Sequence, residues 1–403
     1  MDQAITQPAI DTSNVVELRQ YTLHPGKRDE LMTLFESKFV EGQRALGIHL
    51  HGEFQDTANP DRFVWLRGYD DLSERPRELE AFYKGPVWKA HREQANATMI
   101  DSDNVLLLQP ADGQGFTLAR KMAATMVATI YLLQTSVDAS FLRFFQERVK
   151  PVMEATGAKP VAALKSLEVA NNFPALPVRE GEHAFVWFAA YGNDDELRRH
   201  IEATNNSPEA QAMERELQVK LKSPVQHLVL HPTQRSLDRS REPYRYSLDV
   251  KGDVHDFDFV DGEWNVVNHR LAKRGVGSME WETFPATNWA KVLLGGVTNV
   301  DEIKFPTKGW SGMTVRHFEL AKQQWNICWI NSRDGKMDFP GQLGGFNGDV
   351  GVFYGTDTDE GKPVKVVYRW ERQGKWNARW EQAFSYDDGK SWETNWIIEL
   401  AKK

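Results

Sequence analysis

The feature that most constrains the fold of this chain is a short motif that occurs twice. Phe63-Val64-Trp65, followed by Tyr69, occurs again as Phe185-Val186-Trp187, followed by Tyr191. The offset of 185 − 63 = 122 residues also relates Pro86 to Pro208, Leu106 to Leu228 and Pro110 to Pro232. Self-similarity at a fixed offset is the signature of a structural unit that occurs more than once.

Upstream of the motif the two copies are related by an offset of 110 residues. This offset pairs Tyr21 with Tyr131, Leu31 with Phe141, Leu34 with Phe144, Phe35 with Phe145, and Gly47 with Gly157. The difference, 122 − 110 = 12 residues, predicts an insertion in the second copy. We place it in residues 171–182, where Asn-Asn-Phe-Pro-Ala-Leu-Pro is typical of a loop.

Each copy alternates strand and helix patterns in the order βαββαβ. In the first copy we expect strands at residues 15–23, 48–54, 62–69 and 104–109, and helices over 29–47 and 79–97. That order predicts an antiparallel sheet with helices on one face. Because the other face must be covered, we predict an α+β fold in which tandem ferredoxin-like repeats, residues 15–111 and 124–233, form an intramolecular dimeric α+β barrel.

Several motifs of the first copy resemble the NIPSNAP family. They are Val16-Glu17-Leu18-Arg19-Gln20-Tyr21, Pro25-Gly26-Lys27, Tyr69-Asp70-Asp71-Leu72 with Arg75, and Gly85-Pro86-Val87-Trp88. The second copy matches more weakly and has Ala210 at the position of Trp88. This family is related in fold to antibiotic-biosynthesis monooxygenases, so the resemblance implies a dimeric α+β barrel, but it implies no single chemistry.

The composition changes after a polar segment at residues 234–246, which we interpret as a linker. Residues 247–403 contain 11 of the 14 tryptophans and alternate strand patterns with turns such as Asp334-Gly335 and Asn347-Gly348. This pattern predicts a closed antiparallel barrel or a sandwich. Gly262-Glu263-Trp264 is similar to the Gly-x-Trp start of lipocalins, and with Trp380 to Ser385 and Trp392 to Trp396 the region resembles an uncharacterised lipocalin-like (calycin) family of bacterial barrels.

Composition excludes several classes of partner. The net charge of −8 leaves no basic excess for nucleic acid, and no apolar run is long enough for a transmembrane helix, so we expect neither a nucleic-acid nor a membrane partner. Residues 1–14 lack a secretion-signal pattern, and the single cysteine, Cys328, fits a reducing compartment and a packed strand. We therefore expect a cytoplasmic protein. The Gly-rich stretch 341–355 lacks the Gly-Lys-Ser/Thr ending of a phosphate-binding loop, so we assign no cofactor.

In the first repeat, His49, His51 and Glu53 alternate along one predicted strand and are expected to share one face. Two imidazoles and a carboxylate there can serve as acid/base groups or as ligands of a divalent metal, although solvent-facing histidines without a function are equally ordinary. We take the three as candidate catalytic residues and assign no metal. The second repeat has Lys159, Val161 and Ala163 instead. Trp88, which is not repeated either, is a candidate ligand-binding residue.

In the C-terminal barrel the candidate residues are polar side chains interleaved with tryptophans. Most tryptophans are expected in the core, since each buries a large apolar area. The candidate ligand-binding residues are Trp281, Glu282, Arg316, Trp329, Arg369, Trp380, Glu381, Asn395 and Trp396. Aromatic pockets with a few polar groups are typical of small-ligand sites, whereas an inward Arg369 and Glu381 can equally form a buried ion pair with no ligand.

Three functions remain open from the sequence. The first is binding of a small apolar or aromatic ligand by one or both barrels. The second is an oxygenase, isomerase or lyase that uses the first barrel with His49, His51 and Glu53. The third is an interaction scaffold with filled barrels, and oligomers are compatible with all three.

Overall fold

The computed structural model describes residues 11–241, 243–278 and 280–403. Its contacts divide the chain into an N-terminal unit that ends at residue 242 and a C-terminal unit from Pro243 to Lys403. No helix in the described ranges is both long and apolar enough to cross a membrane. Each unit contains one closed β-barrel.

The N-terminal unit contains two βαββαβ repeats, as the sequence predicted. The first comprises β1 (Val15–Leu23), α1 (Arg28–Leu34), η1 (Phe35–Phe39), α2 (Val40–Arg44), β2 (His49–Asp56), β3 (Arg62–Tyr69), α3 (Glu74–Lys84), α4 (Pro86–Asn96) and β4 (Met99–Pro110). The second comprises β5 (Thr125–Leu133), α5 (Ala139–Phe144), η2 (Phe145–Val149), α6 (Lys150–Ala155), β6 (Pro160–Ser166), β7 (His183–Tyr191), α7 (Asp194–Asn205), α8 (Pro208–Gln218) and β8 (Gln226–Pro232).

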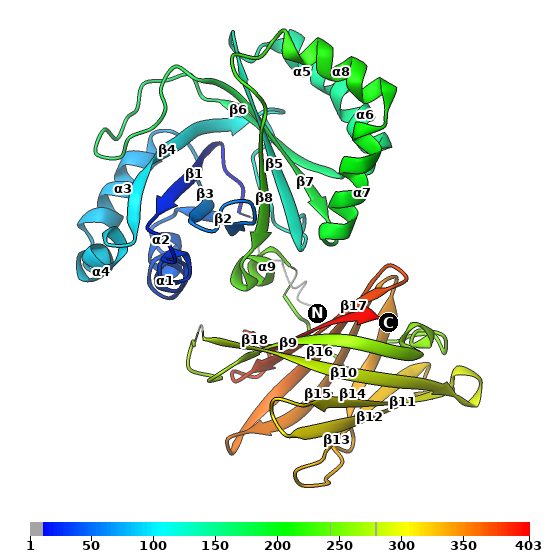
Figure 1. The fold of residues 1–403 in the computed structure, drawn as a ribbon. Coiled ribbons are helices and arrows are strands. Elements are labelled where there is room, and N and C mark those ends of the chain that lie inside the picture. The colour runs from blue at the N-terminus through cyan, green and yellow to red at the C-terminus, as the bar shows by residue number, and fades with distance from the viewer. Residues whose placement is uncertain (1–10, 242, 279) are drawn as a thin grey trace, which may run out of the picture. The chain divides into compact units, whose positions relative to one another are not determined.

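The eight strands close in the order β1-β3-β2-β8-β5-β7-β6-β4. The two repeats join through β2 with β8 and through β6 with β4, which are equivalent pairs under the duplication. Helices of both repeats lie on the outside of this barrel (Figure 1). The predicted closure of one repeat by the other is therefore confirmed.

Local details repeat at the predicted offsets. The π-helix η1 recurs as η2 at an offset of 110 residues, and Gly47 and Gly157 both have positive φ at the end of the helical segment, a conformation that glycine adopts without steric cost. The inserted residues 171–182 lie in the loop between β6 and β7. Asn171 and Asn172 of this loop accept hydrogen bonds from Arg75 of the first repeat.

The interior of the first barrel is apolar and filled. Its core includes Val16, Leu18, Val64, Leu66, Met126, Ile130, Val186 and Phe188, which are all buried. The connection between the repeats adds the buried side chains of Phe116 and Leu118, and Phe116 is 3% exposed. An isolated β-bridge between Phe116 and Ser13 holds this connection in place. Side chains on the other face of the sheet pack under the helices.

The segment in which we placed a linker begins with helix α9 (Gln234–Ser240), which packs on β2 of the N-terminal unit. Thr233 caps this helix, since its side chain accepts a hydrogen bond from the Ser236 amide. The boundary between the two units follows at residues 242 and 243.

The C-terminal unit is almost entirely β-structure. Its elements are η3 (Asp258–Val260), β9 (Gly262–Leu271), β10 (Trp281–Leu293), η4 (Leu294–Gly296), β11 (Thr298–Phe305), β12 (Trp310–Glu319), β13 (Gln324–Asn331), β14 (Gln342–Asn347), β15 (Val350–Asp359), β16 (Lys362–Gln373), β17 (Asn377–Ser385) and β18 (Glu393–Lys402). Neighbouring strands pair antiparallel around the barrel, and β9 closes it by pairing with both β10 and β18.

Ten strands form this second barrel, two more than the eight of lipocalins, so the barrel is confirmed whereas the lipocalin-like assignment is not. Phe257, next to η3, fills one end of the barrel and packs against Trp325, Phe346 and Trp370. Cys328 lies in β13 and is buried, as predicted.

Candidate functional site

The three candidate catalytic residues of the first barrel are not brought together. Leu50 pairs with Arg67 and Gly52 pairs with Leu66, so His51 is the extra residue of a β-bulge. This bulge reverses the alternation after His51. Glu53 pairs with Trp65 and therefore lies on the helix-covered face, whereas both histidines contact Ser13 at the inner face. The expectation that all three share one face is wrong.

His49 and His51 form a small polar cluster with Ser13 at one end of the first barrel. The Ser13 hydroxyl lies 3.0 Å from His49 Nδ1 and 2.8 Å from His51 Nε2, and His49 Nε2 lies 3.7 Å from Asp70. Burial, followed by the neighbouring His49, lowers the pKa of His51 to about 3, so that ring is neutral. Ser13 is only 1% exposed, and Phe116 packs on His51, so the serine hydroxyl is inaccessible as a nucleophile.

Glu53 instead anchors helix α9. Its carboxylate accepts hydrogen bonds from Ser236, at 2.5 Å, and from Arg239. Glu36 of η1 is buried nearby, and burial, followed by the charge of Glu53, raises the pKa of Glu36 to about 7. Two carboxylates and an arginine in this position hold a helix against the sheet. In the described residues, no group of three His, Cys, Asp or Glu side chains is arranged to hold a metal ion.

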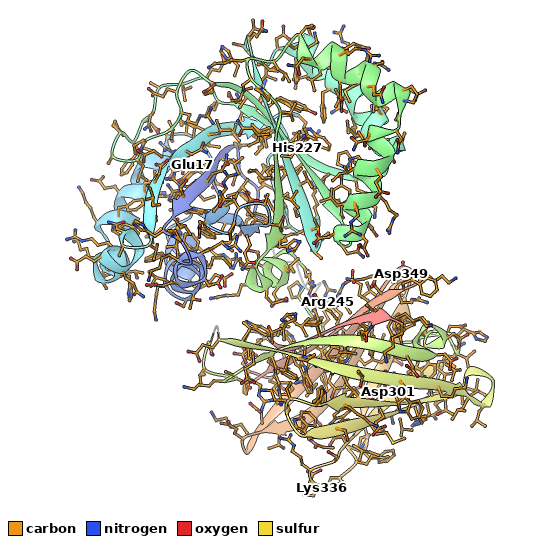
Figure 2. The ribbon with its side chains drawn as sticks, viewed as in Figure 1. Glu17, His227, Arg245, Asp301, Lys336 and Asp349 are labelled. Atoms are coloured by element: carbon orange, nitrogen blue, oxygen red, sulfur yellow. The ribbon has the colours of Figure 1, made fainter. Side chains whose placement is uncertain are left out.

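A larger charged cluster lies between β1 and the helices of the first repeat, at Glu17 (Figure 2). The Glu17 carboxylate accepts hydrogen bonds from Arg19, Arg67 and Arg75 at 2.5, 2.7 and 2.7 Å. All four side chains are at most 1% exposed. Burial alone would raise the pKa of Glu17, but the three guanidinium groups outweigh it and hold the pKa well below its usual range.

This charged cluster is absent from the second repeat. The offsets of 110 and 122 residues place Val127, Thr129, Ala189 and Leu197 at the four equivalent positions, and the pairing of Val127 with Ala189 reproduces that of Glu17 with Arg67. The two repeats therefore adopt the same strand pairing, one with the charged cluster and one without it. Trp88, the other residue that is not repeated, lies on α4 and packs against Phe39, Phe82 and Tyr83.

The C-terminal barrel contains a cavity of about 180 Å³. Eight of the residues that line it are aromatic: Phe305, Trp310, Trp329, Tyr368, Trp370, Trp380, Phe384 and Trp396. Figure 2 shows Asp301 within this barrel, between Lys336 at one end and Asp349 at the other. The cavity opens toward the end that carries Lys336, because Arg333 and Asp338 of the same loop line it, while Phe257 fills the opposite end.

A buried ion pair forms part of the cavity wall. Arg316 donates hydrogen bonds to Asn299, at 2.7 Å, and to Asp301, and its guanidinium lies over the rings of Phe257 and Trp370. Arg316 is 3% exposed. Because Asp301 neutralises the charge of Arg316, this ion pair makes part of the wall polar without adding a net charge to it.

Four of the predicted ligand-binding residues line the cavity, namely Arg316, Trp329, Trp380 and Trp396. Trp281, Glu282, Arg369, Glu381 and Asn395 do not line it. Arg369 and Glu381 face each other on adjacent strands, but their neighbours Tyr368 and Gln382 point into the cavity, so both face outward. Arg369 pairs with Glu371, and Glu381 with Arg379, so the suggested inward Arg369–Glu381 pair is wrong.

Sequence reasoning missed several lining residues, above all Arg270, Trp310 and Tyr368. Arg270 pairs in register with Trp396 across β9 and β18, the first and last strands of this barrel. The available signal was the alternation itself, since Tyr368 and Trp370 lie on the same face of β16.

Comparisons with known proteins cover the first unit only in part. The NIPSNAP family model matches residues 16–112. The first repeat carries a NIPSNAP domain. Similar solved structures include an uncharacterised NIPSNAP domain protein from Burkholderia xenovorans (24% identity, 24% of this chain and 94% of the other, TM-score 0.23) and a NIPSNAP family protein from Agrobacterium tumefaciens (23%, 24% and 93%, TM-score 0.23).

A third similar structure matches more than half of this chain. It is a dye-decolorizing peroxidase from Bacteroides thetaiotaomicron, with 9% identity over 58% of this chain and 97% of the other, and a TM-score of 0.35. These TM-scores are too low to assign an activity to the chain. A search of curated proteins found no match.

Proposed function

We propose that the chain is a small-molecule binding protein whose C-terminal, lipocalin-like barrel holds one aromatic or apolar ligand. The observation that carries this proposal is the cavity of about 180 Å³ inside the ten-stranded barrel, with aromatic and polar side chains on its walls. Mostly apolar pockets with a few oriented polar groups are the usual form of small-ligand sites. The NIPSNAP domain then forms one half of the other barrel, whose interior is apolar.

The alternative of an enzyme in the first barrel has weaker support. Its interior is filled by apolar side chains that include Phe116, and Glu53 lies on the other face of the sheet from His49 and His51. A reaction needs a space in which substrate meets the catalytic groups. The catalytic role of these three residues stays a prediction, and ligand binding by the second barrel is the better supported function.

The test is binding of single-ring aromatic compounds to the full chain, measured by ligand-observed NMR and by tryptophan fluorescence. Five tryptophans line the cavity, so a bound ring is expected to change their emission. Thr314→Phe places a ring into the cavity and is expected to abolish binding, whereas Thr356→Phe, at an exposed position of β15, is the matched control. Equal binding to both variants, or no binding to the wild type, would contradict the proposal.

A further inference from the structure

Arg270 differs from the other charged residues of the cavity. It lies near the end of β9, opposite Trp396 of β18, and its guanidinium carbon is 4.6 Å from the centre of the Trp396 ring. The side chain is half-buried and lines the cavity. Its position places a cation beside the aromatic wall on which a ligand ring would stack.

The other arginines of the cavity have polar partners. Arg316 pairs with Asp301, Arg274 pairs with Asp359, and Arg333, which is exposed, donates a hydrogen bond to Asn331. Arg270 forms no side-chain hydrogen bond and no ion pair with any residue in the described part of the chain. Its guanidinium is therefore a half-buried cation of this cavity without a polar partner among the described side chains.

Carboxylates near Arg270 are already engaged. Glu282 pairs in register with Arg270 but binds Lys308 at 2.9 Å, and Asp359 binds Arg274. Burial, followed by the charges of Arg274 and Arg333, lowers the pKa of Arg270 to about 10. Arg270 thus remains charged at neutral pH, and the nearby carboxylates of Asp359 and Glu282 are bound to other cations.

The other charged residues that line the cavity are three arginines and three aspartates, so Arg270 adds one positive charge to a balanced set. One of these aspartates, Asp301, belongs to the ion pair with Arg316. Burial, followed by the charges of Asp357 and Asp334, raises the pKa of Asp338. Asp357 is exposed at the mouth. The guanidinium of Arg270 beside the aromatic wall favours an anion, because a partly desolvated guanidinium gains most from a planar carboxylate that it can bind with two hydrogen bonds.

The size of the cavity limits the ligand. An apolar cavity of roughly 150 Å³ accommodates benzene, and the present cavity measures about 180 Å³. It therefore suits one aromatic ring with one small substituent. We infer that the C-terminal barrel binds a single-ring aromatic carboxylate, with its carboxylate on Arg270 and its ring between Trp396 and the neighbouring aromatic side chains. This inference rests on the proposed function and specifies the ligand class of the same cavity.

The experiment uses three planar probes of the same shape and different charge: benzoate, benzamide and benzamidine. Calorimetry or ligand-observed NMR on the full chain is expected to show benzoate binding at least about tenfold more tightly than benzamide, and benzamidine binding most weakly. Arg270→Met is expected to lower benzoate affinity to that of benzamide without changing benzamide affinity, and Arg270→Lys to have an intermediate effect. Arg369→Met removes an outward-facing arginine and is the control, with unchanged binding.

The outcomes separate the inference from the proposed function. If benzamide binds as tightly as benzoate and Thr314→Phe abolishes both, the barrel binds aromatic ligands but the role of Arg270 is overturned. Preferred binding of benzamidine would overturn it in favour of a cationic ligand at Asp338 and Asp357. If no probe binds, both the inference and the proposed function fail. Thermal unfolding of Arg270→Met, compared with the wild type, shows whether the variant is folded.

Discussion

The largest buried charge cluster of the first barrel lies outside the barrel wall, whereas the second barrel also lines its interior with charged side chains. In the first barrel the interior is apolar, and Glu17 with its three arginines lies outside the barrel wall, under the helices. In the second barrel Arg316, Asp301 and Arg270 line the interior cavity. Helices cover the outer face of the first sheet and exclude water from it. In the described part of the C-terminal unit the only helical elements are two short 3₁₀ segments, η3 and η4.

This difference shows that barrel closure does not determine whether a cavity forms. Barrel diameter grows with the number of strands, so ten strands enclose more space than eight. The first barrel also receives Phe116 and Leu118 from the connection between its repeats, whereas Phe257 fills only one end of the second. The filled barrel is therefore expected to contribute stability and the hollow barrel to contribute binding.

Removing the filling of the first barrel is expected to have the largest effect. Phe116→Ala leaves a cavity among buried side chains and should cost about 3–5 kcal/mol of the free energy of unfolding. Hydrogen exchange measured by mass spectrometry should show faster exchange in β1 to β8 and no change in β9 to β18. Val219→Ala, at a position that is 72% exposed, is the control. Unchanged exchange in Phe116→Ala would mean that the barrel is not held together by its interior.

Breaking the charged cluster on the outer face should have a comparable effect. Glu17→Gln leaves three buried guanidinium groups without a carboxylate, which is expected to cost about 3–5 kcal/mol. The second repeat supplies a matched control, because its residues can be transferred to the first. The fourfold variant removes every charge of the cluster together: Glu17→Val, Arg19→Thr, Arg67→Ala and Arg75→Leu. Denaturant unfolding should show that the fourfold variant recovers most of the loss. If it is as unstable as Glu17→Gln, the charges themselves organise the repeat.

A pH-dependent effect is expected at Glu36, on the same helix-covered side of the first barrel. Its pKa is raised from 4.5 to about 7, so the folded chain binds a proton that the unfolded chain releases. Stability is therefore lost as the pH rises from about 4.5 to about 7, by up to about 3 kcal/mol. Glu36→Gln should abolish this loss in denaturant unfolding at about pH 5 and about pH 8. Glu30→Gln on α1, an exposed control, should leave it unchanged.

The duplication made the fold of the N-terminal unit predictable. Strand and helix patterns that recur at two constant offsets define both repeats, and each repeat covers the open sheet face of the other. The position of Glu53 was not predicted, because the bulge at His51 reverses the alternation of the strand. Gly52, with its φ of 153°, was the available signal, since glycine inside a strand often marks a bulge. The contact of Arg270 with Trp396 was not predicted, because this register joins strands 126 residues apart, from 396 − 270, and one sequence does not show that pairing.

The smallest expected effect on stability concerns the wall of the hollow barrel. Gly312 leaves room for the Trp329 ring, because a Cβ atom at Gly312 would lie 1.9 Å from the nearest ring atom. Gly312→Ala must therefore displace this wall of the cavity, at a cost of about 1–3 kcal/mol. We expect Gly312→Ala to weaken the binding of aromatic ligands in a fluorescence titration. Ser311→Ala, at the adjacent position of β12, is the control and should leave binding unchanged. If Gly312→Ala binds as the wild type does, Trp329 does not contribute to the ligand site, and the site is confined to the side of the cavity at Trp396 and Arg270.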